Sequence, residues 1–191
     1  MNILSLLKNY LQEKLPPAIR HTHIIIMLLI ISQIIVSNFM EVERNGDIGS
    51  QGIEFYATWA HFITGLILVP LTLLFVVLEF KRRGFSYFFP YLSGKFTQIT
   101  KDFKQLLSFK LPEAQPYGLA AIIQGLGLGS VLLVVSSGLL WFIGWNIGAS
   151  WEHDIKELHE LLTGFVEAYL IGHGLLGLLH VFLLNKEKAI I

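Results

Sequence analysis

Histidines within apolar segments are the residues of this chain whose type and spacing could do chemistry. His159 and His173 lie fourteen positions apart on one strongly apolar stretch. A polar imidazole in hydrocarbon costs free energy unless a partner or a ligand uses it. On a helix, two residues fourteen positions apart point in directions that differ by about 40° around the axis, and they lie about 21 Å apart along it. This arrangement suits one axial ligand to each of two stacked cofactors.

The composition indicates that these histidines lie inside a membrane. The 191 residues are 53% hydrophobic and only 15% charged, with a mean hydropathy of +0.61. Four stretches are long and apolar enough to cross about 30 Å of hydrocarbon. We therefore expect an all-α fold, a single domain over residues 1–191 built as a four-helix membrane bundle, with spans at about 22–40, 55–80, 118–145 and 157–184.

Two further segments have the pattern of helices that lie on a membrane surface. Residues 1–15 carry leucines at helical spacing opposite Lys8, Gln12 and Lys14, with no evident cleavable signal, and Pro16 and Pro17 then break the helix. Residues 81–117 contain a second amphipathic stretch. For that loop the lipid-facing interpretation is favoured over a docking surface for a soluble partner.

Positive charges predict the orientation of the spans. Lys and Arg gather before the first span, between the second and third, and after the fourth. The opposite loops are acidic and hold only Arg44 and Lys156 as cations. The positive-inside rule then places both termini in the cytoplasm of a bacterial inner membrane.

This topology pairs the histidines by depth. His61 in the second span and His159 in the fourth both lie near the outer face. His173 lies about 21 Å deeper, and His23 lies in the first turn of the first span, which starts at the cytoplasmic face. The expected pairs are therefore His61 with His159, and His23 with His173.

Two neutral imidazoles can serve as axial ligands that saturate a haem iron, which favours electron transfer over oxygen binding. The pairs predict two b-type haems, one near each membrane face. The chain has no cysteine, which excludes covalent CxxCH attachment, an iron–sulfur cluster and disulfides. The alternatives are hydrogen-bonded interhelical histidines, or a metal-ion or proton transporter in which Glu167 joins the histidines.

Glycines near the histidines would leave room for a flat macrocycle. Gly65 follows His61 by one turn, and Gly164 follows His159 by five residues. The alternative is close helix packing without a cofactor, which is common for glycine in membrane helices. Both interpretations also apply to Gly172 and Gly174 beside His173, and to the run Gly125, Gly127 and Gly129.

Several short motifs resemble the prokaryotic cytochrome b561 family and the related cytochrome b subunits of hydrogenases and formate dehydrogenases. The similarity covers essentially the whole chain, and the third span lacks histidine, as in that family. The motifs are Arg20-His21-Thr22-His23-Ile24, where the family usually has tryptophan in place of Ile24, Trp59-Ala60-His61, Leu158-His159-Glu160-Leu161 and Leu170-Ile171-Gly172-His173.

The resemblance implies two haems b, bound by His61 and His159 and by His23 and His173, with electrons passed to or from quinone. His21, next to His23, and His180, seven residues beyond His173, are rival ligands for the inner haem. His153 is expected in the solvated outer loop.

We therefore expect a dihaem membrane cytochrome that connects a periplasmic redox protein, such as a cytochrome c or a hydrogenase-like partner, with the quinone pool. It would act either alone or as a subunit of an oxidoreductase complex. A self-sufficient superoxide:quinone oxidoreductase is the alternative within the family, but acidic outer loops would not attract superoxide. Membrane lipid is an expected partner, nucleic acid is not, and a homodimer remains open.

Overall fold

The computed structural model describes all residues except 1–2, 43–47, 49–50, 111, 113–114 and 189–191, and it leaves the side chains of residues 3, 4, 180 and 183–188 undescribed. The described chain is helical throughout, apart from turns and one isolated bridge between Val42 and Ile48. Its elements in chain order are α1 (Ile3–Lys14), α2 (Pro17–Ser37), α3 (Ile53–Arg83), α4 (Phe85–Phe88), the 3-10 helix η1 (Pro90–Ser93), α5 (Thr97–Leu107), α6 (Leu119–Ile147) and α7 (Glu152–Lys188).

Four of these helices are long and apolar enough to cross a membrane: α2, α3, α6 and residues Glu152–Leu179 of α7. The expected all-α membrane bundle with four spans is confirmed. Each helix is longer than its predicted apolar core, because helical geometry continues into the polar flanks. α2 begins at Pro17, since proline is well tolerated in the first turn, where its missing N–H has no intrahelical partner. His23 therefore lies in the second turn of α2 and not in the first, as we had expected.

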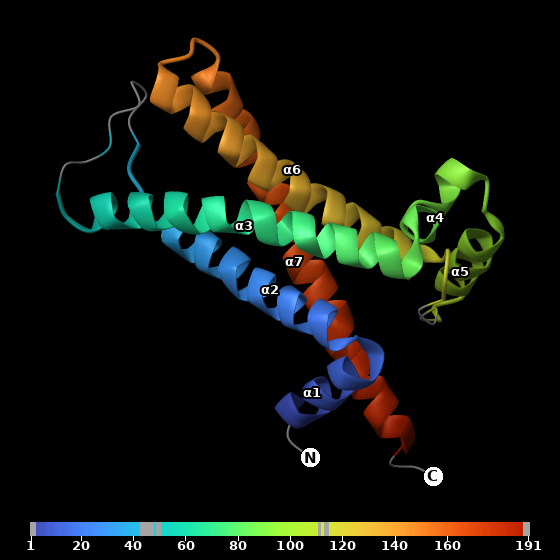
Figure 1. Cartoon of the computed structure of the whole chain (residues 1–191). Helices are drawn as coiled ribbons and strands as arrows, with labels where there is room; N and C mark the ends of the chain where they lie inside the picture. Colours follow the sequence, from blue (N-terminus) through green and yellow to red (C-terminus); the bar gives the residue numbers. More distant parts are fainter. Residues whose placement is uncertain (1–2, 43–47, 49–50, 111, 113–114, 189–191) are drawn as a thin grey trace.

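Figure 1 shows how the spans are arranged. α3 lies between α2 and α6, and α7 crosses behind α3 and continues beside α2 toward the two chain termini. The short helices α4 and α5 lie together beyond the end of α3, next to the start of α6. The connections α2–α3 and α6–α7 form the opposite end of the bundle, which we call the acidic end; the end with the termini, α4 and α5 is the basic end.

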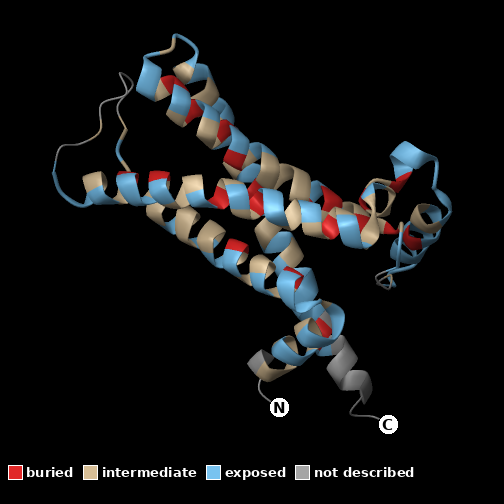
Figure 2. Ribbon diagram, in the orientation of Figure 1, coloured by how far each residue is buried: buried red, intermediate tan, exposed pale blue. Residues whose placement is uncertain are grey.

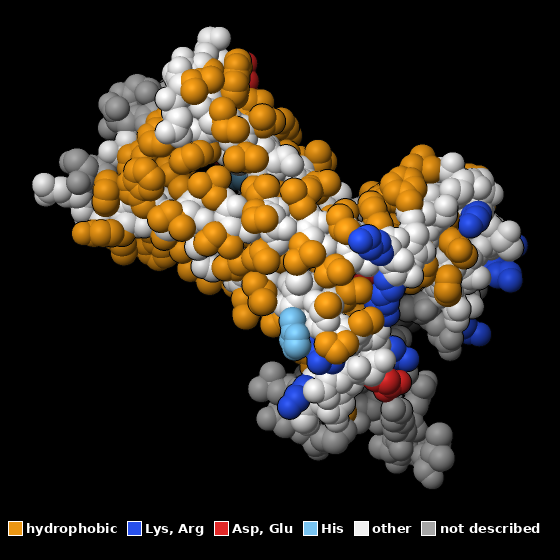
Figure 3. All heavy atoms as spheres, in the orientation of Figure 1, with side chains coloured by type: hydrophobic (Ala, Val, Ile, Leu, Met, Phe, Trp, Pro, Cys, Tyr) orange, Lys and Arg blue, Asp and Glu red, His pale blue; other side chains and the backbone are white. Residues whose placement is uncertain are grey.

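The core is small and lies where α2, α3 and α6 meet. Ile26, Leu68 and Val135 form its buried centre, one residue from each helix. Outside this centre, large apolar side chains are exposed on every span, among them Leu28 on α2, which is 57% exposed. Figure 2 shows exposed positions along the helices, and Figure 3 shows apolar side chains over much of the visible face. Such a surface is stable in lipid tails and not in water.

α5 and α1 occur where the amphipathic pattern predicted helices. On α5, Phe103 and Leu107 are exposed, whereas Asp102 is 1% exposed and points into the protein. The Oδ2 atom of Asp102 accepts a hydrogen bond from the backbone N–H of Leu119 at 2.8 Å, and Gln98 donates to Oδ1. Asp102 thus satisfies a free N–H in the first turn of α6 and fixes α5 to that helix. The position of α1 and α5 at a membrane surface stays a prediction.

Candidate functional site

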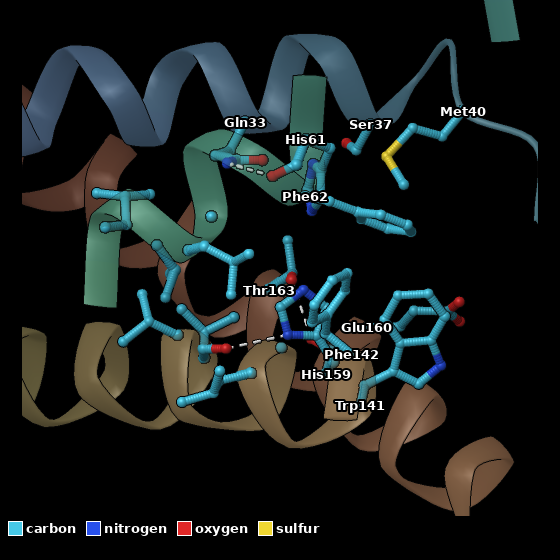
Figure 4. Close-up of a pocket in the computed structure, with 18 of the residues that line it drawn as sticks. Gln33, Ser37, Met40, His61, Phe62, Trp141, Phe142, His159, Glu160 and Thr163 are labelled. Carbon is cyan, nitrogen blue, oxygen red and sulfur yellow. Dashed lines mark hydrogen bonds between the residues drawn. The ribbon is translucent and has the colours of Figure 1, made fainter. Parts of the chain in front are cut away.

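The first histidine pair lies toward the acidic end of the bundle. His61 comes from α3 and His159 from α7, and their ring centroids are 6.3 Å apart with the ring planes at 88°. Both side chains are half-buried and point into the pocket drawn in Figure 4. α3 and α7 run in the same direction, from the acidic to the basic end, so the two residues lie at matched depth near the starts of their helices.

The imidazole of His159 is held by α6 through its Nδ1 atom. Nδ1 lies 3.0 Å from the backbone oxygen of Val134 and 3.0 Å from Oγ of Ser137. A carbonyl oxygen only accepts, so Nδ1 carries the proton and donates. In the neutral ring Nε2 is then the unprotonated nitrogen with the lone pair that a metal needs.

His61 is positioned through its backbone. Nε2 of Gln33, on α2, donates to the carbonyl oxygen of His61 at 3.0 Å and to Oγ1 of Thr64 at 2.6 Å. The ring atom Nδ1 of His61 is buried and has no hydrogen-bond partner within the described part of the chain. A buried imidazole nitrogen without a partner costs free energy, so this ring is prepared for a ligand or a bond that the chain alone does not supply.

A cavity of about 440 Å³ opens beside this pair, within the size range of pockets that bind small molecules and cofactors. Apolar residues of α2, α3, α6 and α7 form most of its wall, and Lys156 and Glu160 line it at the acidic end. Gly65 also lines it; a Cβ atom there would meet only the side chain of Gln33, at 3.5 Å. Gly164 is exposed, has open space at its Cβ position and does not line this cavity.

Gly138 on α6 also lines the cavity and lets the imidazole of His159 approach the helix backbone. A Cβ atom at Gly138 would lie 2.9 Å from Cε1 and 3.2 Å from Nδ1 of His159. Helix α6 therefore contributes to the site although it carries no histidine.

The second pair lies closer to the basic end, where His23 of α2 faces His173 of α7 with ring centroids 6.4 Å apart. The ring of His23 also contacts Phe75, and its buried Nδ1 has no hydrogen-bond partner among the described residues. Tyr169 stacks on His173 at 5.1 Å with the rings almost parallel.

The rival residues for this inner pair have different positions. His21 is exposed and Arg20 is half-buried, so only His23 of this segment faces His173. His180 belongs to α7, but its side chain lies outside the described residues. Gly172 and Gly174 beside His173 have open space at their Cβ positions, as has Gly129 in α6.

The other two glycines of the α6 run serve helix packing. A Cβ atom at Gly125 would lie 2.8 Å from Cβ of Phe88, and one at Gly127 would overlap the ring of Tyr169. These glycines allow α4 and α7 to pack closely against α6. At these two positions the structure therefore agrees with the alternative of close helix packing without a cofactor.

Both pairs fit a metal held between two imidazoles. Two imidazoles that bind one ion from opposite sides, with bonds of about 2.0 Å and nitrogens about 1.1 Å from their ring centres, would have centroids roughly 6.2 Å apart. The observed 6.3 and 6.4 Å match this value. The cavity beside the acidic-end pair agrees with a group bound there.

The residues that a transporter would use are arranged differently. The described residues include no group of three or more His, Cys, Asp or Glu side chains that could hold a metal ion. Glu167 is half-buried in α7. Gln124 of α6 accepts a hydrogen bond from Nη1 of Arg83 at 3.0 Å. His153 lies in the first turn of α7, 3.3 Å from Glu157.

Sequence reasoning missed Gln33, Ser137 and Tyr169. Each is a polar or amphipathic side chain within an apolar span, and such residues usually have a specific partner. For Tyr169 a second signal was present, because it precedes His173 by one helical turn and therefore lies on the same face. For Ser137 there was no such signal, because the third span has no histidine.

Comparison with known protein families identifies the family of this chain. The family model described as prokaryotic cytochrome b561 matches residues 14–189, which include all four spans and both histidine pairs. No curated protein and no solved structure matches the chain. The chain therefore belongs to the prokaryotic cytochrome b561 family, and it is a multi-pass membrane cytochrome that transfers electrons across the membrane.

Proposed function

We propose that this cytochrome binds two haems b, one between His61 and His159 at the acidic end and one between His23 and His173 nearer the basic end. The observation that carries the proposal is the presence of two histidine pairs with ring separations of 6.3 and 6.4 Å, each with one member on α7. The two α7 ligands lie about 21 Å apart along the helix. Two sites at this spacing place a redox centre toward each face of the membrane.

The haem iron would supply the redox chemistry by gaining and losing one electron. The chain's own residues determine what kind of chemistry that is. With one imidazole from each helix of a pair as ligands, the site would favour electron transfer over oxygen binding. The bond from Nδ1 of His159 to Val134 leaves Nε2 as the nitrogen that would hold the metal. The apolar wall of the cavity excludes water and lowers the local dielectric constant.

We further propose that the basic end faces the cytoplasm and the acidic end faces the periplasm of an inner membrane. Arg82 and Arg83 in the last turn of α3, and Lys95 between η1 and α5, are among the cations at the basic end, as the positive-inside rule requires. Asp154 and Glu157 are exposed at the acidic end. Their charges would attract a periplasmic redox protein with a basic docking surface, such as a cytochrome c or a hydrogenase-like partner. Quinone in the membrane would be the second redox partner.

Haem content of single histidine variants tests the assignment. The wild-type protein should contain two low-spin b haems per chain, measured by extraction and by absorbance. His61→Ala and His159→Ala should each remove the same haem, and His23→Ala and His173→Ala should each remove the other. Because His21 and His153 are exposed, His21→Ala and His153→Ala are matched controls that should retain both.

Two results would contradict the proposal in different ways. A haem-free wild-type protein that is folded and active would reject the dihaem function altogether. Loss of the inner haem in His180→Ala, with full haem content in His173→Ala, would replace His173 by His180 as the ligand.

A further inference from the structure

Ser137 is a buried serine on α6, the membrane span that has no histidine. Ser137 is 4% exposed and faces α7. Its hydroxyl donates a hydrogen bond to the backbone oxygen of Val134 at 2.9 Å. The hydroxyl hydrogen is thereby used, so Oγ is an acceptor for the N–H of His159, 3.0 Å away. The proton on Nδ1 of His159 is shared between two oxygen atoms of the same helical turn.

No other histidine of the two pairs has such a bond within the described part of the protein. Nδ1 of His61 and Nδ1 of His23 are buried without a hydrogen-bond partner. The ring of His173 contacts the rings of Tyr169 and His23. The two sites therefore differ in chemistry, although their ring separations are almost equal.

A hydrogen bond accepted from the outer nitrogen of a ligand imidazole has a known effect on the metal. It places negative charge near the N–H, which makes the other nitrogen a stronger electron donor and stabilises the more highly charged oxidised metal. It also fixes the ring orientation and the tautomer. Both effects are transmitted through the ring, so the residue that accepts the bond need not touch the cofactor.

We propose that Ser137 is a positioning residue for the acidic-end haem: it holds the tautomer and orientation of His159 and thereby lowers the reduction potential of that haem. This inference rests on the proposed dihaem function. In this proposal α6 supplies no haem ligand but affects the reduction potential of one haem, the one at the acidic end.

The test is an optical redox titration of the purified full-length protein, with electron paramagnetic resonance of the oxidised haems as a second readout. Ser137→Ala should shift the equilibrium of the acidic-end haem toward the reduced form by about two- to tenfold, the range that one hydrogen bond supports. For a one-electron couple this is about 20–60 mV upward. The low-spin resonance of that haem should also move, because the ring is less constrained, while the other haem keeps its potential.

Ser136 provides the matched control, because it is the preceding residue on the same helix and is exposed. Ser136→Ala should leave both potentials and both resonances unchanged. Ser137→Thr, which retains the hydroxyl, should keep the wild-type potential. Ser137→Cys retains the volume with a weaker hydrogen-bonding group and should raise the potential in the same direction as Ser137→Ala, so it decides the question if Ser137→Ala loses haem.

An unchanged potential in both Ser137→Ala and Ser137→Cys would overturn the inference, as would an equal shift of both haems or a similar shift in Ser136→Ala. Failure of the underlying function has a separate signature. In that case the wild-type protein would lack two b haems, or His159→Ala would retain both of them.

Discussion

A glycine-to-alanine pair on α6 tests the close contact between this helix and His159. At Gly138 an added Cβ would lie 2.9 Å from Cε1 and 3.2 Å from Nδ1 of His159. At Gly129, nine residues earlier on the same helix, an added Cβ would meet nothing within 4 Å. Both substitutions replace glycine inside a helix, and both gain about 0.5–1 kcal/mol from the lower backbone entropy of the unfolded chain. The difference between the two variants therefore isolates the contact with the imidazole.

The magnitude follows from the cost of overpacking. Inserting a methyl group where no room exists costs about 1–3 kcal/mol, so Gly138→Ala should be less stable than Gly129→Ala by this amount. Because every 1.4 kcal/mol is tenfold, this corresponds to a factor of roughly 5 to 150 in the ratio of folded to unfolded protein. The ring of His159 has to move by a few tenths of an ångström, which lengthens its bonds to Val134 and Ser137. Gly138→Ala should therefore also weaken retention of the acidic-end haem.

Denaturant unfolding in detergent and haem content per chain measure the two effects. A double-mutant cycle with His159→Ala completes the test, because the penalty at Gly138 should vanish once the imidazole is removed. If Gly138→Ala is as stable as Gly129→Ala and retains both haems, the imidazole of His159 does not lie against α6, and the site described above is wrong.

Two polar contacts at the basic end give further predictions. Glu79 is 6% exposed and lies 3.7 Å from Arg82 and 3.6 Å from Arg83. Glu79→Leu leaves two partly buried cations without a carboxylate partner and should destabilise the protein by about 3 kcal/mol in denaturant unfolding, whereas an equal stability would mean that the ion pairs contribute nothing. Asp102→Ala removes the acceptor for the N–H of Leu119 and should cost about 1–2 kcal/mol of stability. The chain between α5 and α6 should then be cleaved faster by a protease, and an unchanged rate would show that Asp102 does not hold α5 in place.

The sequence was sufficient to predict the four spans and which histidines face each other. Depth follows from the length of an apolar stretch and from the direction of the chain, and charge asymmetry indicates that direction. His61 and His159 could be expected at one level because both follow an acidic loop within a few residues. The same reasoning placed His23 opposite His173.

The rotation of each helix about its own axis was not predictable in the same way. In α6 the apolar residues cover every face, so no hydrophobic stripe indicates which side packs against protein. Ser136 and Ser137 are neighbours of one residue type, yet Ser137 is buried against His159 and Ser136 is exposed. The same limitation applies to Gly127, because only the packing of α6 against α7 determines that Tyr169 fills the space above it.

The two histidine pairs have similar ring separations but different surroundings. α7 supplies one histidine to each pair, so the ligands themselves do not distinguish the two sites. The groups that surround each pair create the difference. α6 offers backbone and hydroxyl oxygens to His159, and α2 bonds the backbone of His61 through Gln33, while His23 and His173 contact aromatic rings. Because these contacts lie outside the ligand set, each site can be altered without changing a histidine, and substitutions at Ser137 and Tyr169 should act on separate haems.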